Sequence, residues 1–80
     1  MEDKEIYERV VKVISEVLGI DKEKIKPESR FVEDLGAESV QSLELVAGFE
    51  EEFDIEMDED AALKVKTFGD AVKFIKKHLE

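Results

Sequence analysis

The sequence predicts an all-α fold, a small four-helix bundle of three main helices and one short helix with a long first loop. Apolar residues recur at spacings of three and four in three stretches, which is the pattern of a helix with one buried face. No stretch shows the alternation typical of a strand. The 80 residues suffice for one modest core, so a single domain is expected over residues 1–80.

The first main helix is expected from Ile6 to Leu18. Asp3 is predicted to cap its start, because a short acidic side chain can accept a hydrogen bond from the first amides of a helix. Gly19 is predicted to end it, because glycine readily adopts the left-handed conformation found there. The buried stripe is expected to comprise Ile6, Val10, Val13, Ile14, Val17 and Leu18.

From Ile20 to Gly36 the helical periodicity vanishes and Pro27 intervenes. This stretch is therefore predicted to be the long first loop. Three isolated apolar residues are expected to anchor it to the core, and long loops of this kind are often functional. The anchors are Ile25, Phe31 and Leu35.

The second main helix is amphipathic and acidic. Its inward stripe is predicted to be Val40, Leu43, Val46, Ala47, Phe49 and Phe53. The acids Glu44, Glu51 and Glu52 are expected to face outward. This helix therefore offers a negatively charged surface.

A short helix is expected between Asp58 and Lys64, with Asp58 as its cap. The last main helix begins with Thr67 and Asp70, which stand three apart like a capping pair. Its core face is predicted to be Phe68, Ala71, Val72, Ile75 and Leu79, and its final turn carries Lys76, Lys77 and His78, whose charge complements the helix dipole.

Charge is distributed unevenly along the chain. Residues 31–63 hold 12 acidic and no basic side chains, and the net charge of the whole chain is −10. Such a segment repels phosphate backbones and anionic lipids, so we expect no nucleic-acid partner and no membrane insertion, but attraction to basic protein surfaces. The amino terminus is charged and no long apolar run follows, so a signal peptide is not expected and the cytoplasm is the default location.

The residue inventory argues against an enzyme or a metal site. Counted from Asp54, a calcium-binding loop would need a glycine where Glu59 stands and a carboxylate where Val65 stands. The sole histidine, His78, has no cysteine to join it as a zinc ligand, and it is the only imidazole that could activate a serine. We expect no metal and no catalytic residue.

The most informative stretch is Phe31-Val32-Glu33-Asp34-Leu35-Gly36-Ala37-Glu38-Ser39-Val40. Ser39 stands at the predicted first turn of the acidic helix, where an isolated serine usually serves as the helix cap. The free amides and positive dipole end of a helix amino terminus also suit a phosphodiester. Ser39 is therefore a candidate point of attachment.

At these residues the chain resembles the acyl carrier protein family, in which a serine within a G-x-D-S-L motif receives 4′-phosphopantetheine. The resemblance extends from about Ile6 to Leu79. It implies that Ser39 carries the covalent cofactor and that the neighbouring Glu38 and Val40 also belong to the cofactor-binding site. It also implies a monomer that partners a phosphopantetheinyl transferase and the acyl-transfer and synthase enzymes, whose basic patches would meet a docking surface of Glu38, Gln41, Glu44 and Glu51.

The sequence departs from the family pattern at several positions. Glu38 replaces the aspartate of the motif, Val40 its leucine, and Gln41 a common acid, while Asp58 replaces a common proline. Together with the small pair Ala47-Gly48, these departures favour a specialised carrier, for example of polyketide intermediates, over the housekeeping carrier of fatty-acid synthesis. Outside the family, the alternative is an acidic helical interaction module without a prosthetic group.

The small residues Ala47 and Gly48 suggest room for an acyl chain between the helices. Phe68 and Phe74 are expected to line that space. The alternative is that Gly48 permits close contact between two helices and leaves no cavity there.

Overall fold

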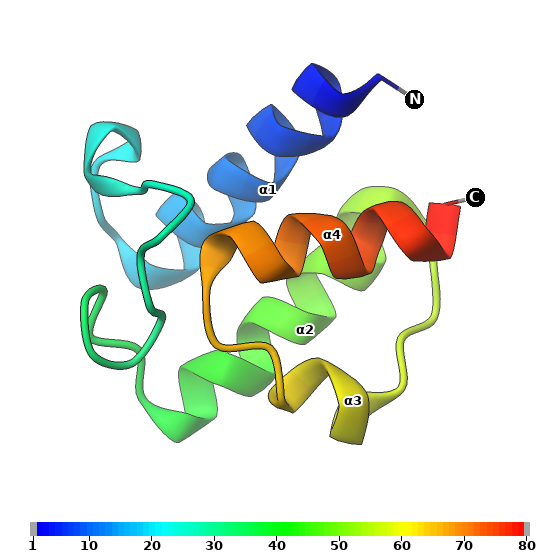
Figure 1. The fold of residues 1–80 in the computed structure, drawn as a ribbon. Coiled ribbons are helices and arrows are strands. Elements are labelled where there is room, and N and C mark those ends of the chain that lie inside the picture. The colour runs from blue at the N-terminus through cyan, green and yellow to red at the C-terminus, as the bar shows by residue number, and fades with distance from the viewer. Residues whose placement is uncertain (1, 80) are drawn as a thin grey trace.

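The computed structural model describes residues 2–79 as a compact arrangement of four α-helices and one 3-10 turn (Figure 1). The elements are α1 (Asp3–Leu18), η1 (Lys22–Lys24), α2 (Ser39–Phe53), α3 (Glu59–Leu63) and α4 (Phe68–Leu79). Within these residues there is no strand, only one isolated bridge between Arg30 and Thr67. The predicted all-α class is confirmed.

Helix α1 buries the first four residues of its predicted stripe, together with Val11, whereas Val17 and Leu18 are half-buried against the core. Gly19 ends the helix as expected, with φ 66° and its N–H donated to the Ser15 carbonyl at 2.9 Å. The prediction for Asp3 is wrong, because the helix already includes this residue and Glu2 occupies the cap position. Asp3 instead pairs with Lys76 at 3.0 Å and so links α1 to α4.

The long first loop is fixed against the start of α4. The Phe31 N–H donates to the Lys66 carbonyl at 3.0 Å, and the Phe68 N–H donates to the Ser29 carbonyl at 3.0 Å. Ile25 and Phe31 are buried as predicted, and Leu35 packs against the core in part. The loop is therefore a structural part of the wall around the core.

Helix α2 buries Phe49 and Phe53 as predicted, but not the whole predicted stripe. Leu45, Phe49 and Phe53 are its buried residues, whereas Val40 is 63% exposed and Leu43 is 45% exposed. Residues four apart share one face of a helix, so position 45 belongs with 49 and 53. The residues at positions 40, 43 and 47 form a second apolar row that faces solvent, and periodicity alone does not distinguish such a row from the core.

Glu52 also departs from its expected outward position. Its side chain is only 17% exposed and accepts from Arg9 Nε at 2.7 Å and from Lys12 Nζ at 3.3 Å. The Arg9 guanidinium carbon lies 5.2 Å from the Phe53 ring centroid. This acid therefore joins α2 to α1 and is not part of an outer acidic surface.

The two last helices begin as predicted. Asp58 Oδ1 accepts from the Asp60 N–H at 3.0 Å, and Thr67 Oγ1 accepts from the Asp70 N–H at 3.1 Å. Helix α4 buries Phe68, Ala71 and Ile75, and its last turn carries the expected basic residues. No helix within residues 2–79 combines the length and the apolar character that crossing a bilayer requires.

Candidate functional site

Ser39 is the first residue of α2 and its side chain is exposed. The cap position before it belongs to Glu38, whose backbone N–H donates to Gln41 Oε1 at 2.9 Å. This is the Gln41 half of a capping box, so α2 does not use Ser39 as its cap. The Ser39 hydroxyl makes no hydrogen bond with any residue between 2 and 79, and it remains available for chemistry.

Ser42, one turn further along α2, differs from Ser39. It is half-buried, and its hydroxyl donates to the Glu38 carbonyl at 3.4 Å. The structure thus places one serine outward with an unused hydroxyl and a second against the body of the protein with a partner.

The segment before Ser39 is held in place by local hydrogen bonds. Gly36 adopts φ 71°, which favours glycine, and the Ala37 N–H donates to the Phe31 carbonyl at 2.8 Å. The Arg30 N–H donates to Asp34 Oδ2 at 2.8 Å. This backbone hydrogen bond, with the Arg30 guanidinium beside it, lowers the pKa of the Asp34 carboxyl. The position of Ser39 therefore rests on an ordered turn.

An exposed row follows Ser39 along α2. We call the α2 outer face the exposed side chains Val40, Leu43, Glu44, Ala47 and Glu51. Glu44 and Glu51 are seven residues apart and thus two turns along the same side of the helix. Of the predicted docking residues, Glu38, Glu44 and Glu51 are exposed, whereas Gln41 is half-buried and accepts from the backbone of Glu38.

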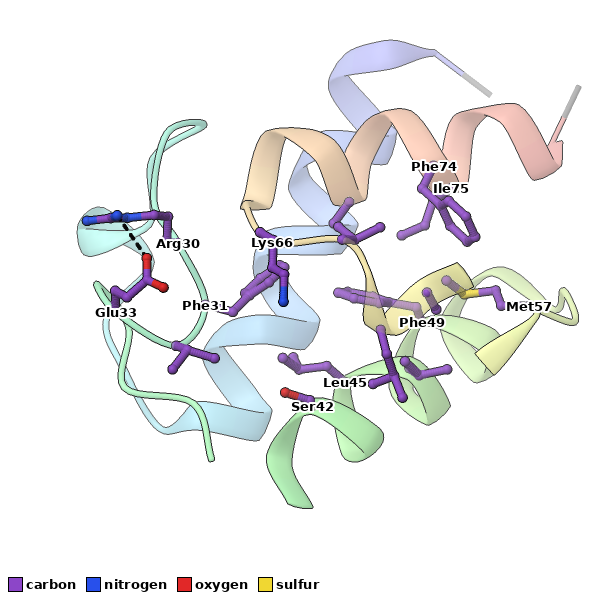
Figure 2. Close-up of a pocket in the computed structure, with 16 residues that line it drawn as sticks. Arg30, Phe31, Glu33, Ser42, Leu45, Phe49, Met57, Lys66, Phe74 and Ile75 are labelled. Atoms are coloured by element: carbon purple, nitrogen blue, oxygen red, sulfur yellow. Dashed lines mark ion pairs between the residues drawn. The ribbon is translucent and has the colours of Figure 1, made fainter. Parts of the chain in front are cut away.

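A cavity of about 260 Å³ opens on another side of α2, one turn from Ser39 (Figure 2). Its wall is largely apolar, and three elements besides the first loop contribute to it. From α2 and α4 the principal lining residues are Ser42, Leu45, Phe49, Ala71, Phe74 and Ile75. Such a shape suits a short or medium hydrocarbon chain, whose burial is worth about 25 cal/mol per Å² of apolar surface.

The cavity does not lie at Ala47 and Gly48, where the sequence predicted room for an acyl chain. Ala47 is exposed, and a Cβ at Gly48 would lie 2.8 Å from Val13 Cγ1, so Gly48 permits close contact between α1 and α2. Phe74 lines the cavity as expected. Phe68 does not, because it is fully buried in the core with its ring 4.8 Å from that of Tyr7.

Leu45 was not identified as a lining residue from the sequence. Its spacing of four from Phe49 places both residues on the same face of α2 and could have indicated it. Of the acids weighed as calcium ligands, Asp58 caps α3 through its Oδ1. Between residues 2 and 79, no three His, Cys, Asp or Glu side chains are placed to hold a metal ion.

Two comparisons with known proteins found related sequences along most of the chain. Residues 8–75 match the family model described as the phosphopantetheine attachment site. The chain is 51% identical over 75 residues to an acyl carrier protein of Phenylobacterium zucineum (strain HLK1), a match that covers 94% of this chain and 95% of that protein.

Proposed function

The chain belongs to the acyl carrier protein family, and from this premise we propose that Ser39 is the residue that carries its 4′-phosphopantetheine arm. The protein is a carrier and not a catalyst, and the relatives give no support to an interaction module without a prosthetic group. When attached, the arm supplies a terminal thiol that holds an acyl group as a thioester.

The observation that carries this proposal is the contrast between the two serines of the first turns of α2. Ser39 is exposed with an unused hydroxyl, while the Ser42 hydroxyl donates to the Glu38 carbonyl. The first amides of α2 and the positive end of its dipole favour a phosphodiester at Ser39. The base that removes the Ser39 proton is supplied by the transferase, which fits the lack of a nearby histidine.

The residues beside Ser39 suit an enzyme that must reach this hydroxyl. Glu38 and Val40 are both exposed, so the transferase can contact either side of the serine. Gln41 holds the backbone of Glu38, and we assign it a positioning role within the docking surface.

The acyl chain is proposed to enter the cavity beside Ser42. The cavity has a volume of about 260 Å³, and its apolar lining suits a hydrocarbon chain of short or medium length. Leu45, Phe49 and Phe74 would then replace water around the chain.

As an acyl carrier protein, the chain partners acyl-transfer and synthase enzymes. We propose that these enzymes and the phosphopantetheinyl transferase contact the α2 outer face and Glu38 through basic patches. The exposed Glu44 and Glu51 would steer the approach, and Val40 and Leu43 would add apolar contact at its centre. We further propose that the protein acts as a cytoplasmic monomer in a specialised pathway, since a net charge of −10 opposes self-association.

Attachment is tested by incubating the protein with coenzyme A and a phosphopantetheinyl transferase. Intact mass should rise by one phosphopantetheine group in the unaltered protein and in Ser42→Ala, and should stay constant in Ser39→Ala. A peptide map then locates the group. If Ser42→Ala blocks the addition and Ser39→Ala accepts it, the assignment of the serines is reversed.

Docking is tested by reversing the charge of Glu44 and Glu51 to lysine. Association with a basic transferase should slow about tenfold at low salt and depend less on salt, because the steering charge is lost. The matched control reverses two exposed acids elsewhere, Glu8 and Glu23, and should retain most of the rate. Equal rates for both double variants would reject the α2 outer face as the docking surface.

A further inference from the structure

Met57 lies on the connection between α2 and α3 and lines the cavity (Figure 2). Its side chain is half-buried and packs against the core. Figure 2 shows it at the opposite end of the cavity from Arg30, Glu33 and Lys66, which are the charged residues of the lining. The Met57 thioether therefore belongs to the apolar end of the cavity.

The backbone around Met57 is held by hydrogen bonds on both sides. Glu50 Oε2 accepts from the Met57 N–H at 2.9 Å, and the Glu50 carbonyl accepts from the Ile55 N–H at 3.1 Å. Asp58 Oδ1 then accepts from the Asp60 N–H at 3.0 Å in the cap of α3. Because the connection is fixed in this way, a change in the size or polarity of the Met57 side chain acts on the cavity wall and on α3.

Met57 is also the most readily oxidised side chain among residues 2–79. The whole chain has no cysteine and no tryptophan, and its only other methionine is Met1. Peroxides convert a thioether to a sulfoxide, which is polar and accepts hydrogen bonds. The lining residues that α3 and α4 contribute are all apolar and offer no side-chain donor to such an oxygen: Ala62, Leu63, Ala71, Phe74 and Ile75.

A sulfoxide at this position weakens the folded state by either of two routes. If the oxygen stays within the wall, a polar atom is buried without a partner, which is unfavourable. If the side chain turns toward water, the contacts of Met57 with the core are lost. Both routes act on the side of α2 that faces α3.

We propose that Met57 is a reversible oxidation site for hydrogen peroxide, through which oxidation loosens the α2–α3 side of the fold. The sulfur attacks one peroxide oxygen, so that an S–O bond forms as the O–O bond breaks. The proton of the transferred oxygen passes to the departing one, which leaves as water. The sulfur is thereby oxidised by two electrons and the peroxide is reduced.

The reverse step is the one that methionine sulfoxide reductases perform with a dithiol. Two thiols become a disulfide, and the sulfoxide oxygen leaves as water. The proposal goes beyond the proposed function and does not depend on an arm at Ser39, so it is tested on the protein before any arm is attached.

The test treats this protein with hydrogen peroxide at neutral pH. Peptide mapping should place one added oxygen on Met57, and the melting temperature should fall by roughly 5 °C, the size expected for one buried polar group without a partner. Reductases for both sulfoxide epimers, supplied with dithiothreitol, should restore the mass and the melting temperature. Met57→Leu is the matched control, because leucine has nearly the same volume and Met1 remains. Peroxide should change the melting temperature of this variant by less than about 1 °C.

NMR amide shifts supply a second measurement, which locates the effect. Oxidation should move the amide signals of α3 and of Phe74, while those of η1, which lies outside the lining, should stay in place. Met57 left unmodified under conditions that oxidise free methionine would overturn the proposal, and so would equal melting of the oxidised and unoxidised proteins. An equal loss in Met57→Leu would assign the effect to Met1 and reject Met57. A loss that the reductases fail to reverse would reject a reversible site.

Discussion

The side of α2 that faces α1 is closely packed at Gly48, beneath an open groove on the surface, whereas the side that faces α3 and α4 borders a cavity of about 260 Å³ (Figure 2). On the first side, Gly48 lets Val13 approach, and Glu52 accepts from Arg9 and Lys12. On the second side, Leu45 and Phe49 line space that side chains leave unfilled.

This difference lets a chain of 80 residues combine a firmly held α2 with a cavity beside it. Close packing and a charged hydrogen bond fix α2 to α1, so the position of Ser39 does not depend on the cavity. The cavity side is incompletely filled and therefore loses packing contacts in the empty state. On the proposed function, an acyl chain attached at Ser39 restores those contacts without moving α2.

The largest expected effect comes from breaking the packed side with Gly48→Leu. A Cβ here would already lie 2.8 Å from Val13 Cγ1, so a leucine must push α1 and α2 apart. Overpacking of this kind should lower the free energy of unfolding by about 3 kcal/mol, measured by urea denaturation. Ala47→Leu, next to it on the exposed side, should change stability by less than about 0.5 kcal/mol. Equal losses in both variants would show that the two sides are packed alike.

The second prediction concerns the ion pair on the packed side. The hydrogen bond from Arg9 holds the pKa of Glu52 below its usual range. A lowered pKa in the folded state means that the stabilisation is fully present above the ordinary pKa of glutamate and is lost as the pH falls through the folded value. At pH 7, Glu52→Gln should cost about 1–2 kcal/mol of unfolding free energy.

That cost should shrink as the pH is lowered from 7 to 3 in urea titrations, because Glu52 becomes protonated in the unaltered protein. Glu51→Gln is the control, since the neighbouring acid is exposed and makes no ion pair with a residue between 2 and 79. Its effect should stay within about 0.5 kcal/mol at every pH. A cost of Glu52→Gln that is constant with pH would remove the ion pair as its cause.

The third prediction fills the cavity side. Ala71 is buried on α4 and lines the cavity, so Ala71→Ile should occupy part of the space that the acyl chain would use. Octanoylation should raise the melting temperature of the unaltered protein, and Ala71→Ile should reduce that gain by about half, which corresponds to roughly 0.5–1 kcal/mol. Ala47→Met should leave the gain unchanged because Ala47 faces solvent. A loss in Ala47→Met instead would place the chain on the outer face.

The helix ends could be predicted because their signals are local. Gly19, Asp58 and Thr67 each act through hydrogen bonds to backbone within a few residues. The exception is Asp3, which lies inside the first turn of α1 and pairs with Lys76 of α4.

The faces of α2 could not be assigned from the sequence, because two apolar rows run along this helix. One contains Leu45 and Phe49 and faces the core, and the other contains Val40 and Leu43 and faces solvent. Which row is buried depends on where α1 and α3 lie, and that is a tertiary fact. Glu52 was misplaced for the same reason, because its partner Arg9 is 43 residues away.

The candidate site was only partly predictable. The motif identified Ser39 as a candidate, but a serine at a helix start also suggested a capping role. The spacing of Glu38 and Gln41, three apart, was a local signal for a different cap. The cavity could not be predicted without the fold, since its lining comes from the first loop, from α2, α3 and α4, and from the connections between these helices.

The smallest expected effect is that of salt, and it distinguishes the two sides by sign. Added salt weakens both the repulsion among exposed acids such as Glu44 and Glu51 and the attraction between Glu52 and Arg9. The first change stabilises the folded state, and the second destabilises it. With a net charge of −10 the repulsion should dominate, and raising salt from 10 to 200 mM at pH 7 should increase the melting temperature by roughly 3 °C. In Glu52→Gln the melting temperature should rise more with salt than in the unaltered protein, because the opposing attraction is absent. In the Glu44→Lys, Glu51→Lys double variant it should rise less. Scanning calorimetry measures all three, and a melting temperature that is flat or falls with salt in the unaltered protein would mean that the outer acids do not oppose folding.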